Sequence, residues 1–206
     1  MGYVSRTKSS HYELTSRFRE LTVGTEFPES AMSCFRQTVT SLAEATGESG
    51  VLAELRRDRV AVVAQAQHSQ VLMLNTFEIY AALSLYHSVS GRILVSYLEQ
   101  ETRTSLCART GFPCGEWDDI QTSAALEKAC SKIRRTGISV MKNPKLGIIA
   151  FAVPVFWDTA VMSLGLTMPI SRCSPAGRKK ITEQLKIHAD RLSHVEKCRD
   201  ISASPI

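Results

Sequence analysis

The stretch His-Ser-Val-Ser-Gly at 87–91 stands directly before a run of apolar residues. These recur at the spacing of one helix face: Ile93, Leu94, Tyr97 and Leu98. A helix over 88–98 is therefore predicted, with Ser88 as its N-cap. The backbone N–H groups of Val89, Ser90 and Gly91 are then expected unpaired at the positive end of that helix. Since small side chains leave them approachable, the stretch predicts binding of a carboxylate or phosphate; an ordinary capped helix is the alternative.

Cysteine and histidine side chains offer a second kind of chemistry. Cys107 or Cys114 beside His87 would pair a nucleophile with a base, but no third orienting group and no local signature accompanies them. No two histidines have the i, i+4 spacing of a zinc pair, and the GxSxG, Walker and GxGxxG motifs are absent. We therefore expect neither an enzyme nor a metal or other cofactor, with a small cysteine-dependent enzyme kept as a minor alternative.

A polar turn near the N-terminus carries two cations, Arg6 and Lys8. Basic residues at the tip of a hairpin can contact phosphates, although a solvated turn explains them as well. A helix-turn-helix needs two further helices upstream, and the chain begins at Met1 just before this turn. Only weak phosphate contacts are expected here.

Composition places the chain among globular proteins of ordinary make-up. Its 206 residues are 44% hydrophobic and 22% charged, with a net charge of +5. No apolar run reaches the roughly 18 residues of a membrane span, and the N-terminus has no apolar signal core. Six cysteines without a CxxC pair indicate reduced structural thiols. We expect a cytoplasmic protein without membrane contact.

The elements that must position these residues follow from local patterns. Two short extended pieces flank the RTKSS turn, and a helical pattern follows over 16–21. A helix capped by Ser30 and ending near Gly47 presents three apolar residues on one face: Phe35, Val39 and Leu42. Three strand candidates come next, at 51–55, 60–66 and 71–75, in the pattern of an antiparallel meander.

The second half of the chain repeats this mixture. A polar connection through GFPCGEW follows the helix over 88–98, and Thr122 and Gly137 bound another helix. GISVM, IIAFAVPVF and AVMSLGLTMP are strand candidates, the last two continuously apolar and therefore covered on both faces of a sheet. Ser174 and Pro175 start a long final helix. The predicted fold is α+β, a sandwich of helices packed on the faces of an antiparallel sheet.

The order of these pieces resembles the IclR family of bacterial transcription regulators, specifically the C-terminal effector-binding domain, which has a GAF/profilin-like fold. The matching segments run from residue 2 to about 195: GYVSRTKSSHYELTSRFREL, LAELRRDRVAVVAQAQ, VLMLNT, LSLYHSVSGRIL, RRTGISV, GIIAFAVPVF and SLGLTMPISRCS. The resemblance implies three parts: residues 1–27 as a remnant of a wing and a linker helix, 28–198 as the effector-binding domain, and 199–206 as a disordered tail.

What the resemblance implies is a sensor. Family members bind operator DNA through an N-terminal winged helix and bind a small metabolite through the C-terminal domain, which assembles dimers or tetramers. Here the winged helix is expected to be missing. Since only that domain would contact operator DNA, this chain is not expected to bind DNA specifically by itself. An organic acid effector is expected to close the loop at 141–147 and the helix starting at Ser88. The shift is then expected to pass to a linker helix at 15–23 and so to control oligomerisation and DNA binding.

The resemblance also implies where the effector binds. Amides at Val89 and Ser90 would hold its carboxylate. The family's polar pocket positions fall on Met141, Ala150, Gly165 and Thr167, of which only threonine keeps a hydroxyl. An apolar wall is expected from three further residues: Met73, Leu83 and Ile148.

Loss of those polar groups makes the predicted cavity drier and more adaptable. We therefore expect an acid that is bulkier or less polar than glyoxylate or pyruvate, such as an aromatic or acyl acid. The alternative is a pocket closed by its own side chains, in which case the domain only oligomerises.

Overall fold

The computed structural model describes residues 4–6, 12–14, 27–67 and 84–202. The chain divides into two units, Met1–Ala31 and Met32–Ile206, and each is described by itself. In the first unit, β1 (Val4–Arg6) pairs antiparallel with β2 (Tyr12–Leu14), as the sequence predicts. Arg6 ends β1, whereas Lys8 and the helical pattern at 16–21 lie outside the described residues.

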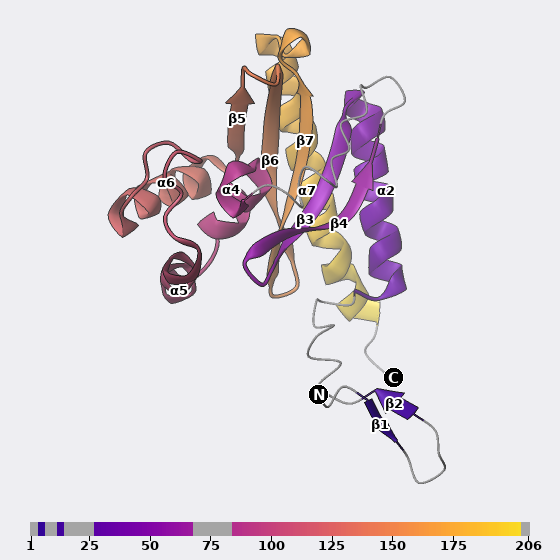
Figure 1. The fold of residues 1–206 in the computed structure, drawn as a ribbon. Helices are drawn as coiled ribbons and strands as arrows, with labels where there is room; N and C mark the ends of the chain where they lie inside the picture. The colour runs from indigo at the N-terminus through magenta and orange to yellow at the C-terminus, as the bar shows by residue number, and fades with distance from the viewer. Residues whose placement is uncertain (1–3, 7–11, 15–26, 68–83, 203–206) are drawn as a thin grey trace. The chain divides into compact units, whose positions relative to one another are not determined.

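The second unit is built on a five-stranded antiparallel sheet with the order β4-β3-β7-β6-β5 (Figure 1). The strands are β3 (Ser49–Arg56), β4 (Arg59–Ala66), β5 (Ser139–Asn143), β6 (Ile148–Trp157) and β7 (Ala160–Pro169). This confirms the predicted α+β class and the strands expected in these segments. The strand expected at 71–75 lies outside the described part of the chain.

Helices α2 (Glu29–Thr46) and α7 (Pro175–Ser202) cover one face of the sheet (Figure 1). Phe35 of α2 meets Trp157 of β6 edge to face, with ring centroids 4.7 Å apart. A Cβ on Gly50 would lie 3.2 Å from Val39, so α2 also packs closely on β3. Phe35, Val39 and Leu42 are fully buried, as their spacing predicts.

The opposite face carries α4 (Val89–Ser96), preceded by the 3-10 turn η1 (Leu85–His87). Helix α6 (Ser123–Thr136) packs on the far side of α4. All eight residues of α4 are buried, because this short helix lies between the sheet and α6. The molecule therefore has the predicted sandwich arrangement, with helices on both faces of the sheet.

Two details of the sequence prediction are wrong. Helix α2 begins at Glu29, so Ser30 lies inside it instead of capping it. The predicted connection after α4 contains an additional helix, α5 (Gln100–Thr110). Its apolar pattern is weak because it buries only Arg103 and Leu106, so helical periodicity could not reveal it.

The predicted starts of α4, α6 and α7 agree with the structure, whereas α4 ends at Ser96, two residues before the predicted end at 98. Thr122 caps α6 by accepting a hydrogen bond from the Ala125 N–H, 3.2 Å from N to Oγ1, and Ser174 caps α7 by accepting one from Gly177. A short turn, η2 (Ile170–Arg172), precedes α7. Helix α7 continues to Ser202, into the segment 199–206 predicted to be a tail, and the proposed domain boundaries remain predictions. None of the helices in the described ranges is long and apolar enough to cross a membrane.

Proline in the central strand β6 has a structural reason. Strand β5 pairs with β6 only from Ile148 to Ala152, so Pro154 lies beyond the end of β5. On its other side Pro154 pairs with Ser163 of β7. A residue without an N–H is tolerated where one side of a strand has no neighbour to receive a hydrogen bond. The strand can therefore extend beyond β5, and in the described residues its C-terminal part after Ala152 has no strand beside it on that side.

Candidate functional site

The N-terminal end of α4 packs directly on the middle of the sheet. A Cβ built on Gly165 of β7 would lie 3.4 Å from Ser90 Oγ and 3.3 Å from Ala152 Cβ. The absence of a side chain at Gly165 therefore lets α4 approach the sheet closely. Since alternate residues of a strand point to opposite faces, this contact identifies which residues of β7 and β6 face α4.

We call the sheet surface under α4, together with the first residues of α4, the effector face. The register places Met141, Ala150 and Thr167 side by side across β5, β6 and β7. Ile148 lies two residues before Ala150 in β6, and Gly165 lies two residues before Thr167 in β7, so both are on the same face. With Val89 and Ser90, the structure thus brings together seven of the nine predicted site residues, whereas Met73 and Leu83 lie outside the described residues.

The effector face is tightly packed. Val89, Ser90, Ala150 and Gly165 are buried, and three others are half-buried: Met141, Ile148 and Thr167. Of the nine predicted residues, the seven that the structure describes line none of its three cavities, which lie along β5, α6 and α7.

 The geometry of the effector face is thus defined by the structure, while its binding role stays a prediction.

The cap of α4 differs in one respect from the prediction. Ser88 Oγ accepts a hydrogen bond from the Gly91 N–H, with 2.9 Å between N and O, so the prediction that the Gly91 amide is unpaired is wrong. Ser90 also has a partner in the structure. A Cβ on Gly91 would lie 1.7 Å from the backbone oxygen of Leu85. Glycine is therefore needed at this position for the close packing of η1 on α4, and not to admit a ligand.

Sequence reasoning missed one polar residue of this face. Ser163 of β7 is fully buried, and its hydroxyl has no hydrogen-bond partner among the residues that the structure describes. It lies two residues before Gly165, so it faces α4, and it is paired with Ala53 of β3. A single serine in an apolar strand carries no signal of this kind in the sequence.

Replacing Ser163 by alanine is expected to leave the free energy of unfolding unchanged or to raise it by up to about 1 kcal/mol. The variant removes a buried hydroxyl whose loss of contact with water is not compensated, and it creates little empty space. Urea denaturation followed by circular dichroism measures the change. A clear loss of stability would show that the hydroxyl has a hydrogen bond in the folded protein.

A second polar residue stands in the middle of α4. Arg92 is only 9% exposed, and its guanidinium donates from Nε to the Tyr86 backbone oxygen at 3.0 Å and from Nη2 to the Glu116 backbone oxygen at 2.6 Å. The same group lies 5.3 Å from the centre of the Trp117 ring. Burial lowers the pKa of Arg92, and the negative charge of Asp118 partly offsets this effect. Arg92 therefore fixes η1 and the loop around Trp117 to α4.

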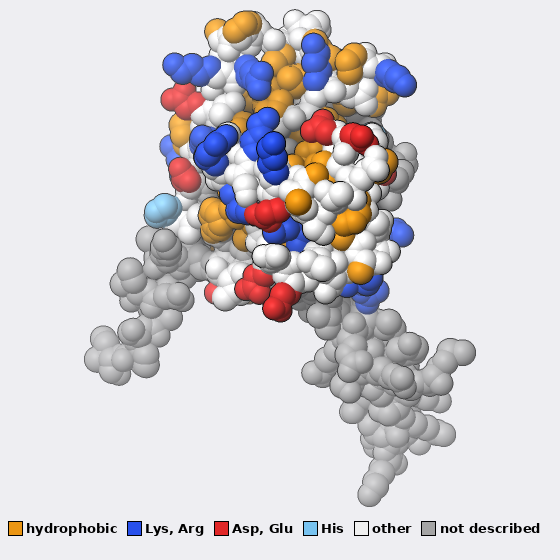
Figure 2. Space-filling view, turned by 90° about the vertical axis from the view of Figure 1, so that its left-hand side faces the viewer, with side chains coloured by type: hydrophobic (Ala, Val, Ile, Leu, Met, Phe, Trp, Pro, Cys, Tyr) orange, Lys and Arg blue, Asp and Glu red, His pale blue; other side chains and the backbone are white. Residues whose placement is uncertain are grey.

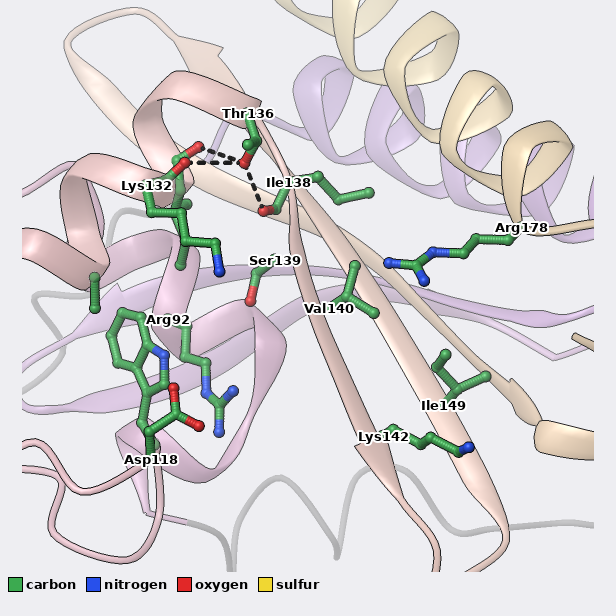
Figure 3. A pocket seen from close by; sticks show the side chains of 13 residues that line it. Arg92, Asp118, Lys132, Thr136, Ile138, Ser139, Val140, Lys142, Ile149 and Arg178 are labelled. Carbon is green, nitrogen blue, oxygen red and sulfur yellow. Dashed lines mark hydrogen bonds between the residues drawn. The ribbon is translucent and has the colours of Figure 1, made fainter. Parts of the chain in front are cut away.

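Arg92 also lines a cleft of about 490 Å³. Figure 3 shows Arg92 and Asp118 on one side of β5, with Lys132 and Ser139 pointing toward the same space, and Arg178 of α7 on the other side. The sequence analysis did not identify this cleft. The one local sign of it in the sequence is Arg92, a charged residue directly before the apolar residues Ile93 and Leu94 of α4.

The residues of the enzyme alternative are not brought together by hydrogen bonds. Cys107 Sγ lies 3.6 Å from the Tyr86 hydroxyl, and Cys114 Sγ lies 4.0 Å from Asp119 Oδ1. In the described part of the chain, no hydrogen bond joins the His87 ring to either thiol. The geometry thus gives no support to a cysteine nucleophile activated by this histidine.

Comparisons with known proteins agree with this architecture. Residues 31–194 match the family model for the C-terminal region of the bacterial transcriptional regulator IclR. A curated relative, the probable transcriptional regulator SauR of Cupriavidus necator, is 26% identical over 194 residues, which cover 92% of this chain and 76% of the relative.

Two solved structures with the same fold contain a bound acid. One is the inducer-binding domain of the PobR transcription factor from Acinetobacter, a double mutant in complex with 3-hydroxybenzoic acid. It has a TM-score of 0.64 and 18% identity, and the match covers 77% of this chain and 94% of that one. The other is an IclR homologue from Microbacterium hydrocarbonoxydans with 4-hydroxybenzoate, with a TM-score of 0.65 and 16% identity, covering 94% of this chain and 80% of that one.

Proposed function

Because the chain belongs to the IclR family of bacterial transcriptional regulators and carries the effector-binding domain, we propose that its effector face binds a small aromatic carboxylic acid. The observation that carries the proposal is the arrangement of the effector face itself. Seven predicted residues come from four elements: Val89 and Ser90 begin α4, and the other five share the sheet face on which α4 packs. A helix N-terminus favours an anion, and the apolar side chains beside it favour a ligand with a hydrophobic body.

The chemistry of the side chains supports an aromatic acid over a shorter one. Met141, Ile148 and Ala150 offer no hydrogen bonds, and Thr167 is the one residue among the five strand positions with a side-chain hydroxyl. A two- or three-carbon acid has little apolar surface to bury against such residues. Hydroxybenzoates are bound by two regulators of the same fold, which supports this choice of ligand class.

Binding would act on DNA through the assembly of the protein. A ligand changes an equilibrium only by binding one state more tightly than another. We propose that the effector favours one arrangement of α4 and the sheet, and that this arrangement favours one oligomeric state and one affinity for operator DNA.

A thermal-shift experiment tests the ligand class. Benzoate, 3-hydroxybenzoate and 4-hydroxybenzoate are compared with glyoxylate and pyruvate, using the whole chain. At a concentration of 100 times Kd a ligand adds about 2.7 kcal/mol of stability, and the melting temperature is expected to rise by roughly 5–10 °C for at least one aromatic acid. The two short acids are expected to give no shift.

A matched pair of variants locates the binding. Thr167→Val removes the Thr167 hydroxyl from the effector face and is expected to weaken binding of the aromatic acid by about fivefold. Thr104→Val is the control, since this threonine lies exposed on α5 and bonds only to Gln100 of its own helix. Equal affinities for both variants would place the acid elsewhere.

One observation favours a second candidate function, an oligomerisation domain with a closed pocket. Ser90 Oγ lies within van der Waals reach of the position that a Gly165 side chain would take, so this part of the effector face is filled. A lack of thermal shift across a broad panel of organic acids, together with a stable dimer or tetramer in sedimentation, would support this candidate over the sensor.

A further inference from the structure

Strand β5 forms one edge of the sheet. Its one neighbour in the described ranges is β6, and no backbone hydrogen bond outside the sheet involves Ser139–Asn143. One side of β5 therefore presents N–H and C=O groups that can pair with another extended chain. At five residues, the strand offers about 16 Å of such an edge.

The cleft of about 490 Å³ follows this edge, and we call it the edge groove. Strand β5 contributes Ser139, Val140 and Lys142 to its lining. In Figure 3, Arg92 and Asp118 lie on one side of the strand, while Ile149 and Arg178 lie on the other. A chain lying beside β5 would therefore find side chains to contact on both of its faces.

The edge groove is strongly basic. An adjoining cavity of about 510 Å³ shares Asp118, Ala129 and Lys132 with it. Together the two cavities are lined by one carboxylate, that of Asp118, and six cations: Arg92, Lys128, Lys132, Arg135, Lys142 and Arg178. None of the six forms an ion pair with a residue that the structure describes. Figure 2 shows Lys and Arg side chains next to hydrophobic ones on this face.

These features together select the kind of partner. A second copy of this chain would bring the same cations against one another, which is unfavourable. Duplex DNA offers phosphates, but it has no apolar side chains for the groove residues Ile133, Val140 and Ile149. An extended peptide satisfies the open strand edge, and its apolar side chains cover the floor. Its carboxylates pair with the cations other than Arg92, whose guanidinium already donates to two backbone oxygens.

We propose that the edge groove binds an extended acidic segment of a partner protein, which pairs with β5 as an additional strand of the sheet. This interaction is separate from the predicted effector residues, because none of the seven that the structure describes lines the groove. A regulator with such a surface can contact another protein while its effector site is occupied.

The probe is a short fluorescein-labelled peptide of alternating Asp and Val, measured by fluorescence anisotropy with the whole chain at about 0.15 M salt. Binding is expected for this peptide and not for its Lys-Val counterpart. Lys132→Glu and Lys142→Glu are each expected to weaken binding by about tenfold. Lys180→Glu on α7 is the control, since this exposed lysine changes the net charge equally and lines none of the cavities.

Two further measurements separate strand pairing from simple charge attraction. Amide exchange at 139–143 is expected to slow when the peptide binds, and N-methylation of the peptide backbone is expected to abolish binding. The proposal is overturned if the acidic peptide does not bind, if Lys180→Glu weakens binding as much as the groove variants, or if the N-methylated peptide binds equally well. Stronger binding of duplex DNA that depends on Lys132 and Lys142 would also overturn it.

Discussion

Gly91→Ala is expected to destabilise the domain by about 3 kcal/mol or more. The new Cβ would stand 1.7 Å from the backbone oxygen of Leu85, which is far inside van der Waals contact. The clash is with a backbone atom of η1, which cannot rotate away as a side chain can. Helix α4 cannot move away easily either, because it is buried over its whole length. Thermal and urea denaturation of the variant measure the loss, and a poor yield of folded protein would be the extreme form of the same result.

Gly177→Ala provides the matched control. This glycine also lies in a helix, but the nearest atom to its Cβ would be Ser174 Oγ at 3.1 Å, the end of a side chain that has to move only slightly and can keep its cap bond to the Gly177 N–H. Alanine is the better helix former, so the stability is expected to stay within about 1 kcal/mol of the original. Similar behaviour of the two variants would contradict the steric explanation for Gly91.

Arg92→Met is expected to cost about 2–4 kcal/mol of stability. Methionine keeps much of the apolar volume but leaves the backbone oxygens of Tyr86 and Glu116 without their donor, and the contact with the Trp117 ring is lost. Arg92→Lys should retain part of the stability, since one ammonium group cannot reach both oxygens with the geometry of the guanidinium. Denaturation measures the difference, and near-UV circular dichroism reports the loosening of Trp117.

Arg109→Met is the control for the loss of an arginine. Arg109 makes a bidentate pair with Asp58, but both side chains are exposed, and this neighbour lowers the pKa of the aspartate. Water and salt replace such a pair at little cost. A clearly smaller loss than for Arg92→Met is expected, and equal losses would show that burial of Arg92 contributes little.

The strongly patterned parts of the chain were predictable from sequence. The apolar runs of β6 and β7 indicate strands covered on both faces, and capping residues such as Thr122 and Ser174 mark the starts of helices. Helix α5 was not predicted, because it buries too few side chains to produce a periodic apolar pattern. Local patterns record what one element buries, so an element held mainly by its polar contacts is not visible in them.

The site was predictable only in part, for a related reason. The alignment with family motifs identified residues that lie together on the effector face, and strand register explains why they do. Gly91 was interpreted as leaving an amide accessible, whereas its role depends on the Leu85 oxygen, whose position only the folded backbone reveals. The edge groove combines α4, α6, β5 and α7, and no short segment of sequence contains that combination.

The complete burial of α4 has a mechanical consequence. A helix without a water-exposed side cannot slide into solvent when a molecule presses on its first turn, and a close-packed interior has little slack to take up the displacement. Movement at that turn must therefore be passed on to the adjacent strands and to α6. A displacement of a few atoms at the first turn of α4 can therefore move surfaces of the same domain that lie far from it.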